Sequence, residues 1–380
     1  MDFRLTEDQQ MARETAREFA EKRLRPLAQK FDEEEAIGRE LYTEAAELGF
    51  FGMTVPEEYG GLGLDPIGTA CVMEELARAS ASFQVCLSVH NSLVCGAIKG
   101  FGSEAQKKKY LPRLAKGEMI GAYSLSEQGS GSDAGSLRAS AARGEDSYVV
   151  NGSKAWVTNA GFADLFAVFL STDKEKGSRG ISCLLMERGL EGFSIGKKER
   201  KMGIRGSDTR ELSFSDCEAP AEALLGVENE GYKIALSLLD GGRIGIAAQA
   251  VGIAQAAFDE AVAYAKQREQ FGSPLADFQA TRFKLADMAL GVEAARLLTW
   301  RAAAALGGGR ATREASMAKL FASQTANRVA YDAVQIHGGN GYIREFPVER
   351  YFRDARVTEI YEGTSEIQRL VISREILRAS

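Results

Sequence analysis

Residues 147–171 read SYVVNGSKAWVTNAGFADLFAVFLS and residues 181–186 read ISCLLM, and these two stretches decide the fold. Short runs of β-branched and aromatic residues are bounded here by Gly, Asn, Asp and Ser, a pattern typical of strands that end in turns. Twenty of the forty glycines lie between residues 117 and 245, and no proline occurs between Pro112 and Pro220. The middle of the chain is therefore predicted to consist of strands and turns.

The regions on either side of these strands have helical patterns instead. In the first third, Thr6 with Gln9 and Ser103 with Gln106 have the spacing of capping boxes, and Gly49 stands where a helix is expected to stop. After the strands, good helix formers without internal proline predict long helices over 230–268, 276–306 and 311–336. Three long helices indicate a bundle, and Gly307-Gly-Gly-Arg is predicted to be a turn between two of them.

The order helical, β, helical differs from the strand and helix alternation of a doubly wound sheet. It predicts a multi-domain α+β protein with boundaries at 1–118, 119–226 and 227–380.

Composition excludes several classes of protein. The 380 residues carry a net charge of −6, which disfavours a general affinity for nucleic acid or anionic membranes. Two histidines and five cysteines without CxxC spacing disfavour a metal site and suggest reduced thiols. The apolar stretch 244–258 is shorter than the roughly 18 residues that span a bilayer. The acidic amino terminus is unlike a signal or transit peptide, so we expect a cytoplasmic protein, or a mitochondrial one already processed.

The common catalytic and nucleotide-binding motifs are missing. The sequence contains no GxGxxG, no GxxxxGK[ST] and no GxSxG. His90 and His337 each stand alone among apolar neighbours, where a packed histidine is the ordinary interpretation. Hydrolase functions are therefore disfavoured.

Two other passages have a composition that suits a ligand site. Residues 122–136, AYSLSEQGSGSDAGS, form a loop dense in Ser and Gly, which can bring backbone N–H groups close to a pyrophosphate or a polar heterocycle, or can be a plain connection. Residues 361–369, YEGTSEIQR, place Glu362 in a turn before a helix that the spacing of Ser365 and Gln368 predicts to be capped. Glu362 is either an exposed turn residue or a base whose pKa an apolar cleft raises.

Six stretches in register resemble the acyl-CoA dehydrogenase family over essentially the whole chain. They are Tyr123-Ser-Leu-Ser-Glu with Gly131-Ser-Asp, Lys154-Ala-Trp-Val-Thr-Asn, Arg268-Glu-Gln-Phe-Gly, Gln335-Ile-His-Gly-Gly-Asn-Gly-Tyr, Tyr351-Phe-Arg-Asp-Ala-Arg, and Ile360-Tyr-Glu-Gly-Thr-Ser-Glu-Ile-Gln. Leu238-Leu-Asp-Gly-Gly-Arg-Ile-Gly-Ile-Ala and Leu297-Leu-Thr-Trp-Arg-Ala-Ala make the short-chain, butyryl-type members the nearest match.

The resemblance implies an N-terminal all-α domain, a middle antiparallel β-barrel domain and a C-terminal four-helix-bundle domain. It also implies FAD bound without a Rossmann fold, which explains the missing dinucleotide fingerprint. Thr158 is expected at flavin N5 and Trp156 over the ring, and part of the set is expected to serve the FAD of a neighbouring subunit. The implied cofactor contacts are Tyr123, Leu125, Ser126, Gly131, Ser132, Trp156, Val157, Thr158, Arg268, Gln270, Phe271, Gln279, Gln335, Gly338, Gly339, Thr364 and Glu366.

By resemblance, Glu362 is the catalytic base that removes the α proton of an acyl-CoA while the β carbon delivers hydride to flavin N5. Some relatives place the base on the long helix instead, where this chain has Gly241 and Gly242. Asp240 and Arg243 are expected at the adenine end of CoA, or as a surface i,i+3 ion pair. The implied substrate contacts are Ser132, Asp240, Arg243, Tyr361, Glu362 and Gly363, and no metal is expected.

The resemblance further implies a homotetramer, a dimer of dimers, that passes electrons to an electron-transfer flavoprotein. Three alternatives stay open at this point. They are a dehydrogenase of short branched acyl-CoA, an acyl-CoA oxidase on the same fold, and a non-catalytic scaffold homologue.

Overall fold

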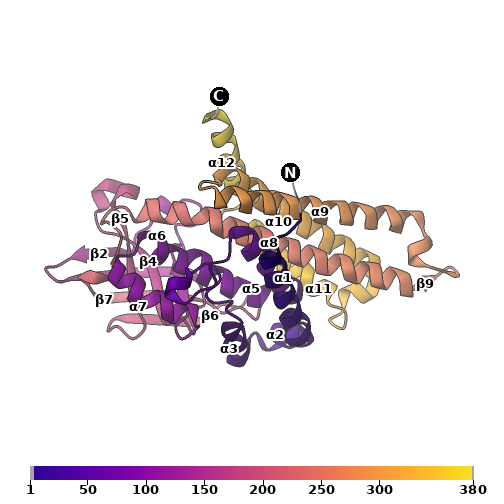
Figure 1. The fold of residues 1–380 in the computed structure, drawn as a ribbon, viewed down its shortest axis with the longest axis horizontal. Helices are drawn as coiled ribbons and strands as arrows, with labels where there is room; N and C mark the ends of the chain where they lie inside the picture. The colour runs from indigo at the N-terminus through magenta and orange to yellow at the C-terminus, as the bar shows by residue number, and fades with distance from the viewer. Residues whose placement is uncertain (1–3, 379–380) are drawn as a thin grey trace.

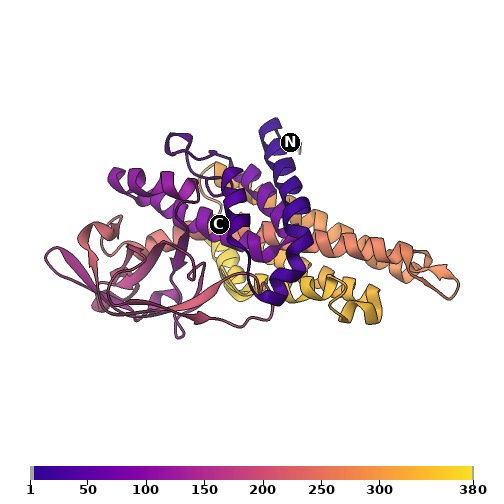
Figure 2. The ribbon, with the colours of Figure 1, turned by 90° about the horizontal axis from the view of Figure 1, so that it is seen from below.

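The computed structural model describes residues 4–378 and confirms the predicted order of helical, β and helical regions. The sheet occupies one end of the molecule, and the longest helices run from beside it to the opposite end (Figure 1, Figure 2). The N-terminal helices pack between these two parts.

Seven α-helices form the first region as the structure describes it. They are α1 (Glu7–Phe19), α2 (Ala28–Glu34), α3 (Arg39–Glu47), α4 (Pro66–Ala79), α5 (Ala81–Ser88), α6 (Gly96–Phe101) and α7 (Glu104–Ala115), with π-helical turns at Ala20–Leu24 and Val89–Cys95 and 3-10 turns at Arg25–Leu27 and Glu57–Tyr59. Thr6 and Ser103 cap α1 and α7 through the reciprocal side-chain bonds that their spacing predicts. Gly49 adopts φ +78° just after α3, as a helix stop requires.

The middle region is one sheet, and the predicted strand runs fall inside its strands. The strands are β1 (Gly121–Ser124), β2 (Ser140–Arg143), β3 (Ser147–Thr158), β4 (Leu165–Ser171), β5 (Ile181–Glu187), β6 (Phe193–Lys198), β7 (Thr209–Pro220) and β8 (Leu224–Leu225). Their order is β6-β7-β3-β2-β4-β5-β8, with β1 paired to β4. Short 3-10 turns at Ala134–Ser136, Lys174–Gly180 and Ala221–Ala223 lie between the strands.

The sheet corrects the expectation of a closed antiparallel barrel. Its end strands β6 and β8 do not pair within the described residues, and β8 has only two residues, so the sheet stays open. β1 runs parallel to β4, and β2 also meets β4 in parallel at Ser140 and Ser171. Residue patterns predict where strands lie, but a parallel pairing joins strands far apart in sequence. The β2–β3 hairpin lies between β1 and β4 along the chain, which removes any local signal for their pairing.

Strand β4 shows why the quoted stretch decides the fold. Its seven residues are all buried, because alternate side chains enter two different cores. Leu165 and Phe169 pack toward the helical side with Leu111, whereas Phe166 and Val168 pack inside the sheet region. The continuous apolar run is therefore the shared wall of two cores.

The C-terminal region contains the three long helices at the predicted positions, within three residues. They are α8 (Gly231–Gln267), α9 (Gln279–Gly307) and α10 (Thr312–His337). A small hairpin of β9 (Glu269–Gln270) and β10 (Ser273–Pro274), followed by a 3-10 turn (Leu275–Asp277), joins α8 to α9. Further on, 3-10 turns (Gly338–Tyr342 and Val357–Glu359) flank α11 (Val348–Arg356), and α12 (Ser365–Arg378) ends the described chain. α11 packs against both α10 and α8, whereas α12 packs against α10.

Two helical stretches are long and apolar enough to cross a membrane by length and composition. They are Ala81–Phe101 and Gly231–Gln267, and 83% and 78% of their most apolar windows are buried inside the protein. Gly252 of α8 shows how closely these helices pack, because a Cβ there would lie 2.4 Å from the Glu74 carbonyl oxygen of α4. Both stretches therefore serve as core helices here.

Candidate active site

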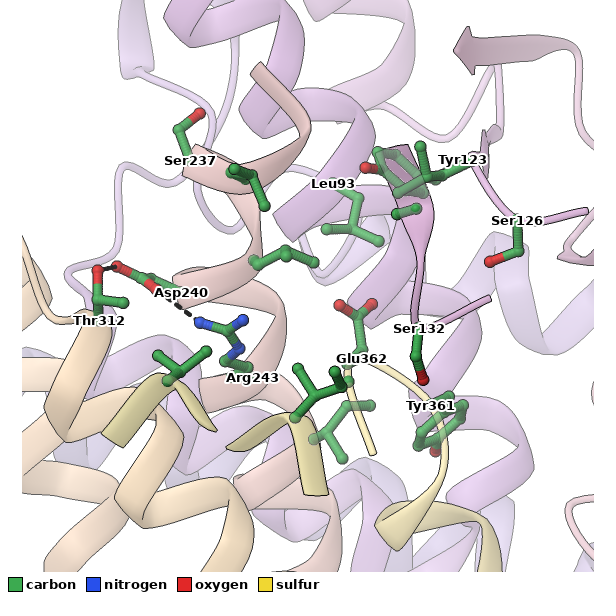
Figure 3. Close-up of a pocket in the computed structure, with 18 of the residues that line it drawn as sticks. Leu93, Tyr123, Ser126, Ser132, Ser237, Asp240, Arg243, Thr312, Tyr361 and Glu362 are labelled. Carbon is green, nitrogen blue, oxygen red and sulfur yellow. Dashed lines mark hydrogen bonds and ion pairs between the residues drawn. The ribbon is translucent and has the colours of Figure 1, made fainter. Parts of the chain in front are cut away.

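A cavity of about 1130 Å³ lies where the sheet, α8 and the carboxyl-terminal tail meet (Figure 3). It brings together most of the predicted residues of the middle region and of the tail. The predicted residues that line it are Tyr123, Leu125, Ser126, Gly131, Ser132, Trp156, Thr158, Asp240, Arg243, Tyr361, Glu362 and Gly363.

The turn at residues 361–364, called the tail turn below, carries Glu362 into this cavity. Glu362 and Gly363 both adopt left-handed backbone conformations, with φ +54° and +91°. A left-handed non-glycine residue costs of order 1–3 kcal/mol and persists only when its surroundings hold it. Here the Gln368 side-chain amide donates to the carbonyl oxygens of Glu362 (3.0 Å) and Gly363 (2.9 Å), and Lys319 Nζ donates to the second of them (2.7 Å).

The helix after the tail turn begins at Ser365, as predicted, but its cap corrects the prediction. The Thr364 hydroxyl accepts from the Ile367 N–H, whereas the buried Ser365 hydroxyl has no partner within the described residues. The cap therefore lies one residue earlier than expected. Gln368 is instead used to hold the tail turn, a role that capping-box spacing does not reveal.

The surroundings of Glu362 suit a base. Burial raises the pKa of its carboxyl from 4.5 to about 7, and the nearby charges of Arg243 and Lys319 limit the rise. A Cβ built on Gly242 would lie 2.6 Å from Glu362 Oε2, so this helix position has no room for a side chain while the tail carboxylate occupies the cavity. A carboxyl with a pKa near neutrality is a functional-site candidate.

Arg243 and Asp240 form the predicted i,i+3 ion pair, but it is buried and not on the surface. Arg243 Nη1 lies 3.2 Å from Asp240 Oδ1, and the Thr312 hydroxyl donates to Asp240 Oδ2 over 2.7 Å (Figure 3). Both charged side chains are almost fully buried at the cavity wall, and the Arg243 Nε has no partner in the described chain.

Strand β3 also lines the cavity, through Trp156 and Thr158. Trp156 has φ +56° at a break in the β3–β7 register, and 51% of its surface is exposed although its neighbours are buried. A bulge of this kind re-aims a side chain out of the alternating pattern. Val157 does the opposite, because its side chain is buried in the sheet core.

A buried ion pair fixes the loop that follows β1. Lys154 Nζ lies 2.8 Å from Glu127 Oε1 and 3.0 Å from the Leu125 carbonyl oxygen. The Glu127 carboxylate also accepts from the N–H groups of Arg138 and Ala139, and burial lowers the pKa of Lys154 to about 8. The wall formed by Ser126 to Ser132 is therefore held rigidly against β3.

These cavity residues fit the FAD that the resemblance implies. The hydroxyl of Tyr123 is buried without a partner in the described residues, and a Cβ at Gly131 would meet open space. Unpaired polar groups in an otherwise apolar wall are the usual setting for a ligand with polar edges.

A second set of predicted residues lies elsewhere, and we call it the distal group. It comprises Arg268, Gln270, Phe271, Gln279, Gln335, Gly338 and Gly339, none of which lines the cavity. Its members are exposed around the β9–β10 hairpin and the end of α10. Arg268 follows Arg243 by 25 residues along α8, which corresponds to roughly 38 Å of helix. Thr364, the last residue of the tail turn, and Glu366, in the first turn of α12, also lie outside the cavity lining.

Sequence reasoning missed a basic cluster near one part of the cavity wall. Arg310 comes from the turn between α9 and α10, and Arg374 and Arg378 from α12. Glu375 balances only part of this charge, through ion pairs with all three arginines. The signal was present in the predicted Gly307-Gly-Gly-Arg turn and in the i,i+4 spacing of two arginines in the tail.

Both histidines are packed residues, as their apolar neighbours in the sequence predict. His90 and His337 are buried, the first against Phe51 and the second stacked on Tyr264. All five cysteines are buried, and residues 4–378 contain no cluster of metal-ligand type.

Comparison with known proteins gives the family of this chain. Models of the N-terminal, middle and C-terminal domains of acyl-CoA dehydrogenase match residues 6–118, 122–217 and 229–377. The mitochondrial short-chain specific acyl-CoA dehydrogenase of Mus musculus is 50% identical over 99% of this chain and 91% of its own. The structure of butyryl-CoA dehydrogenase from Megasphaera elsdenii superposes with a TM-score of 0.98 at 47% identity, over the whole of both chains.

Two further structures bear on cofactor and partner. A chain solved in a study of the electron-transferring flavoprotein of Acidaminococcus fermentans has a TM-score of 0.98 at 48% identity, over the whole of both chains. An acyl-CoA dehydrogenase from Bacillus anthracis, solved in complex with FAD, has a TM-score of 0.92 at 36% identity over 98% of this chain and 67% of its own. The chain described here therefore belongs, along almost its whole length, to the acyl-CoA dehydrogenase family of FAD-dependent oxidoreductases.

Proposed function

We propose that this protein converts a short-chain acyl-CoA to the trans-2-enoyl-CoA, with Glu362 as the base that removes the α proton. The observation that carries the proposal is the placement of Glu362 in the cavity with a pKa of about 7. A base whose pKa lies near the working pH is ionised in a substantial fraction of the molecules and is still basic enough to remove a proton.

FAD is proposed to lie along the wall formed by Tyr123 to Ser132 and by Trp156 to Thr158. When bound, it supplies the acceptor, at N5, for the hydrogen that leaves the β carbon as hydride, and it later passes the electrons on. The protein's share is to hold this wall in place through the Lys154–Glu127 pair and to keep water away from the reacting carbons.

Glu362 is proposed to take the α proton, leaving an enolate whose charge develops on the thioester oxygen. No described residue accepts a hydrogen bond from the Glu362 N–H, so this donor is free for that oxygen. Donors aimed at developing charge are often the largest contribution to catalysis. After the transfer the Glu362 carboxyl is neutral, which is the form that its apolar surroundings favour.

The CoA part of the substrate is proposed to contact Ser132, Asp240 and Arg243. The basic cluster of Arg310, Arg374 and Arg378 adds a counter-charge for the CoA phosphates, because guanidinium groups bind phosphate through paired hydrogen bonds. Tyr361 and Gly363 line the same cavity and are proposed to border the acyl chain. The short-chain preference rests on the names of the relatives, and a short branched substrate is the second candidate.

The distal group is proposed to serve the FAD of a second copy within a homotetramer. Arg268 lies too far along the axis of α8 to reach the cavity of its own chain, and no other member of the group lines that cavity. The exposed face of α9 carries Phe283, Leu290 and Leu297 at seven-residue spacing, and Leu290 is 71% exposed. Such a stripe on a long helix is typical of an interface with another protein.

An electron-transfer flavoprotein is the proposed acceptor of the electrons, and the cytoplasm is the proposed compartment. The similar chain from the study of the Acidaminococcus flavoprotein supports the partner. The compartment stays a prediction, since one relative is a mitochondrial protein.

Anaerobic mixing of the purified protein with butyryl-CoA tests the proposal. We expect a yellow protein whose flavin absorbance bleaches, most rapidly with butyryl-CoA in a panel that includes hexanoyl-, octanoyl-, isobutyryl- and 2-methylbutyryl-CoA. The reduced protein should reoxidise slowly in air and rapidly with an electron-transfer flavoprotein. Rapid reoxidation in air with stoichiometric peroxide would show an oxidase, a faster branched substrate would show the second candidate, and a colourless protein that cannot bind FAD would show a scaffold.

A further inference from the structure

Two residues that the proposed mechanism does not use donate hydrogen bonds to the backbone carbonyls of the tail turn. Lys319, on α10, is 0% exposed, and its ammonium lies 2.7 Å from the Gly363 carbonyl oxygen. Gln368, on α12, is also 0% exposed, and its amide nitrogen donates to the carbonyls of Glu362 and Gly363. Three hydrogen bonds from two helices therefore end on two consecutive peptide groups.

These bonds fix a conformation that the chain does not favour by itself. Glu362 is a non-glycine residue at φ +54°, and the bonded carbonyls belong to the two peptide groups that follow it, so the bonds hold the backbone from which its carboxylate projects. Gly363 leaves no room for a substitute, since a Cβ there would lie 2.6 Å from the Gln368 amide nitrogen. The Gln368 side chain therefore packs directly against the Cα of Gly363, and this contact requires glycine at position 363.

Lys319 also brings a charge to the site. Burial lowers the pKa of its ammonium from 10.5 to about 8, and the charge of Glu362 is the largest effect that opposes this decrease. Burying an ammonium group costs free energy unless the group is hydrogen-bonded and paired with an opposite charge. The burial of Lys319 beside the tail turn therefore indicates a functional role. The other charges that act on Lys319 are Arg243 on α8, Glu359 just before the turn and Glu366 on α12.

We propose that Lys319 and Gln368 are positioning residues of the dehydrogenation reaction, Lys319 by keeping Glu362 ionised and Gln368 by orienting its peptide groups. The inference rests on the proposed function of Glu362 as the base. Lys319 acts through its charge and its bond to Gly363, whereas Gln368 acts through geometry alone. The two residues therefore have separable effects.

The direction in which the Lys319 charge shifts the pKa of Glu362 follows from the groups that face Glu362. Arg243 from α8 and Lys319 from α10 both lower the pKa of its carboxyl, and burial raises it. The phenols of Tyr123 on β1 and Tyr361 in the turn also face it, and the Glu362 charge raises the pKa of both. Loss of Lys319 removes one of two opposing cations, so the pKa of Glu362 must rise.

The experiment measures the rate of anaerobic flavin reduction by saturating butyryl-CoA from about pH 6 to about pH 9.5. In Lys319→Met we expect the acid limb of the profile to move to higher pH. The rate should be about tenfold lower at pH 7 and should recover to within about threefold of the parent enzyme at pH 9. Lys319→Gln, which keeps a donor but no charge, should show the same displacement, and Lys319→Arg, which keeps the charge, should not.

Gln368→Met should instead leave the acid limb in place and lower the plateau at every pH, by about tenfold or more. Lys107→Met, which removes a lysine from the surface of α7, is the matched control and should leave the profile unchanged. FAD content, melting temperature and the Kd for the product enoyl-CoA accompany each variant, so that loss of folding is recognised.

An acid limb that stays at the parent pH in both neutral Lys319 variants, or a rate that falls equally at every pH, would overturn the proposed role of Lys319. If neither Lys319 variant retains FAD, Gln368→Met decides the matter, and a parental plateau in that variant would overturn the proposal. Failure of the unmodified protein to be reduced by any acyl-CoA would refute the proposed function itself, which is a different result.

Discussion

The family resemblance predicts site residues in both the tail turn and the distal group, but the two regions differ in the structure. Buried side chains support the tail turn, whereas the residues of the distal group are exposed. Both contain a strained aromatic or acidic residue, Glu362 at φ +54° in the first and Phe271 at φ +53° in the second. Glu362 is held by buried partners from α10 and α12, whereas Phe271 is 97% exposed on the β9–β10 hairpin, where its ring contacts Phe278.

The difference bears on whether each region is supported by its own chain or is exposed to another molecule. Internal hydrogen bonds hold the left-handed backbone of Glu362, whereas the positive φ of Phe271, like that of Gly272 at +80°, is what a two-residue hairpin turn between β9 and β10 requires. The supports of Glu362 come from its own chain, whereas the residues of the distal group are exposed. A second copy is the proposed recipient, and the following changes test that contrast.

Glu362→Gln is expected to have the largest effect. The amide keeps the shape of the side chain but cannot accept the α proton, and a general base contributes about 10²–10⁴-fold to a rate. We expect bound FAD and acyl-CoA with flavin reduction slowed by that factor, measured by stopped-flow absorbance. Turnover at the parent rate would mean that another residue is the base.

Gly363→Ala should come next, because it attacks the internal support of the tail turn. A Cβ at this position would be strained by φ +91° and would meet the Gln368 amide nitrogen at 2.6 Å. We expect a roughly 10²-fold slower reduction, because the reacting groups move out of line. Gly100→Ala, on α6 and outside the cavity lining, where a Cβ also meets open space, is the control. Equal rates in the two variants would show that the support is unnecessary.

Arg268→Ala should remove a proposed FAD contact of the distal group and leave the tail turn unchanged. We expect the protein to fold and to bind FAD at least about tenfold more weakly, in line with the loss of a charged hydrogen bond of about 1.5–3 kcal/mol. Retained FAD after dialysis, compared with the parent protein, is the measurement. Lys266→Ala, which removes a cation from the end of α8, serves as the charge control. Undiminished FAD binding by the arginine variant would remove the distal group from the cofactor site.

Thr364→Ala should have the smallest effect. It removes the cap of α12, whose hydroxyl accepts from the Ile367 N–H, and such a loss costs about 1 kcal/mol of stability. The unfolding midpoint in urea should fall accordingly, with flavin reduction slowed by less than the Gly363 variant. Ser365→Ala, which removes a hydroxyl without a partner in the described residues, should not destabilise the protein, and the reverse order would show that Ser365 is the cap.

The sequence predicted local features of the fold well and long-range features poorly. The limits of α8, α9 and α10 were predictable to within three residues because good helix formers fill them without interruption by proline. The parallel pairing of β1 with β4, and the open edge between β6 and β8, depend on contacts between distant segments and left no local pattern.

The candidate site shows the same division. The position of Glu362 before a helix was predictable from the turn and cap residues around it. Its raised pKa, its left-handed backbone and its two buried supports were not, because Lys319 lies 43 residues away along the chain and looks like an ordinary helix residue there. The distal group was recognised only by resemblance, and its separation from the cavity became visible only in three dimensions.

The most direct test of a site divided between copies is complementation between two impaired variants, at an FAD concentration too low to fill the Arg268→Ala protein. Glu362→Gln keeps an intact distal group, and Arg268→Ala keeps an intact tail turn. Co-expression followed by purification of the mixed oligomer should restore flavin reduction by butyryl-CoA well above that of either variant alone, because one hybrid site then has both Glu362 and Arg268. A mixed oligomer no more active than its parents would contradict the account and would confine the whole site to a single chain.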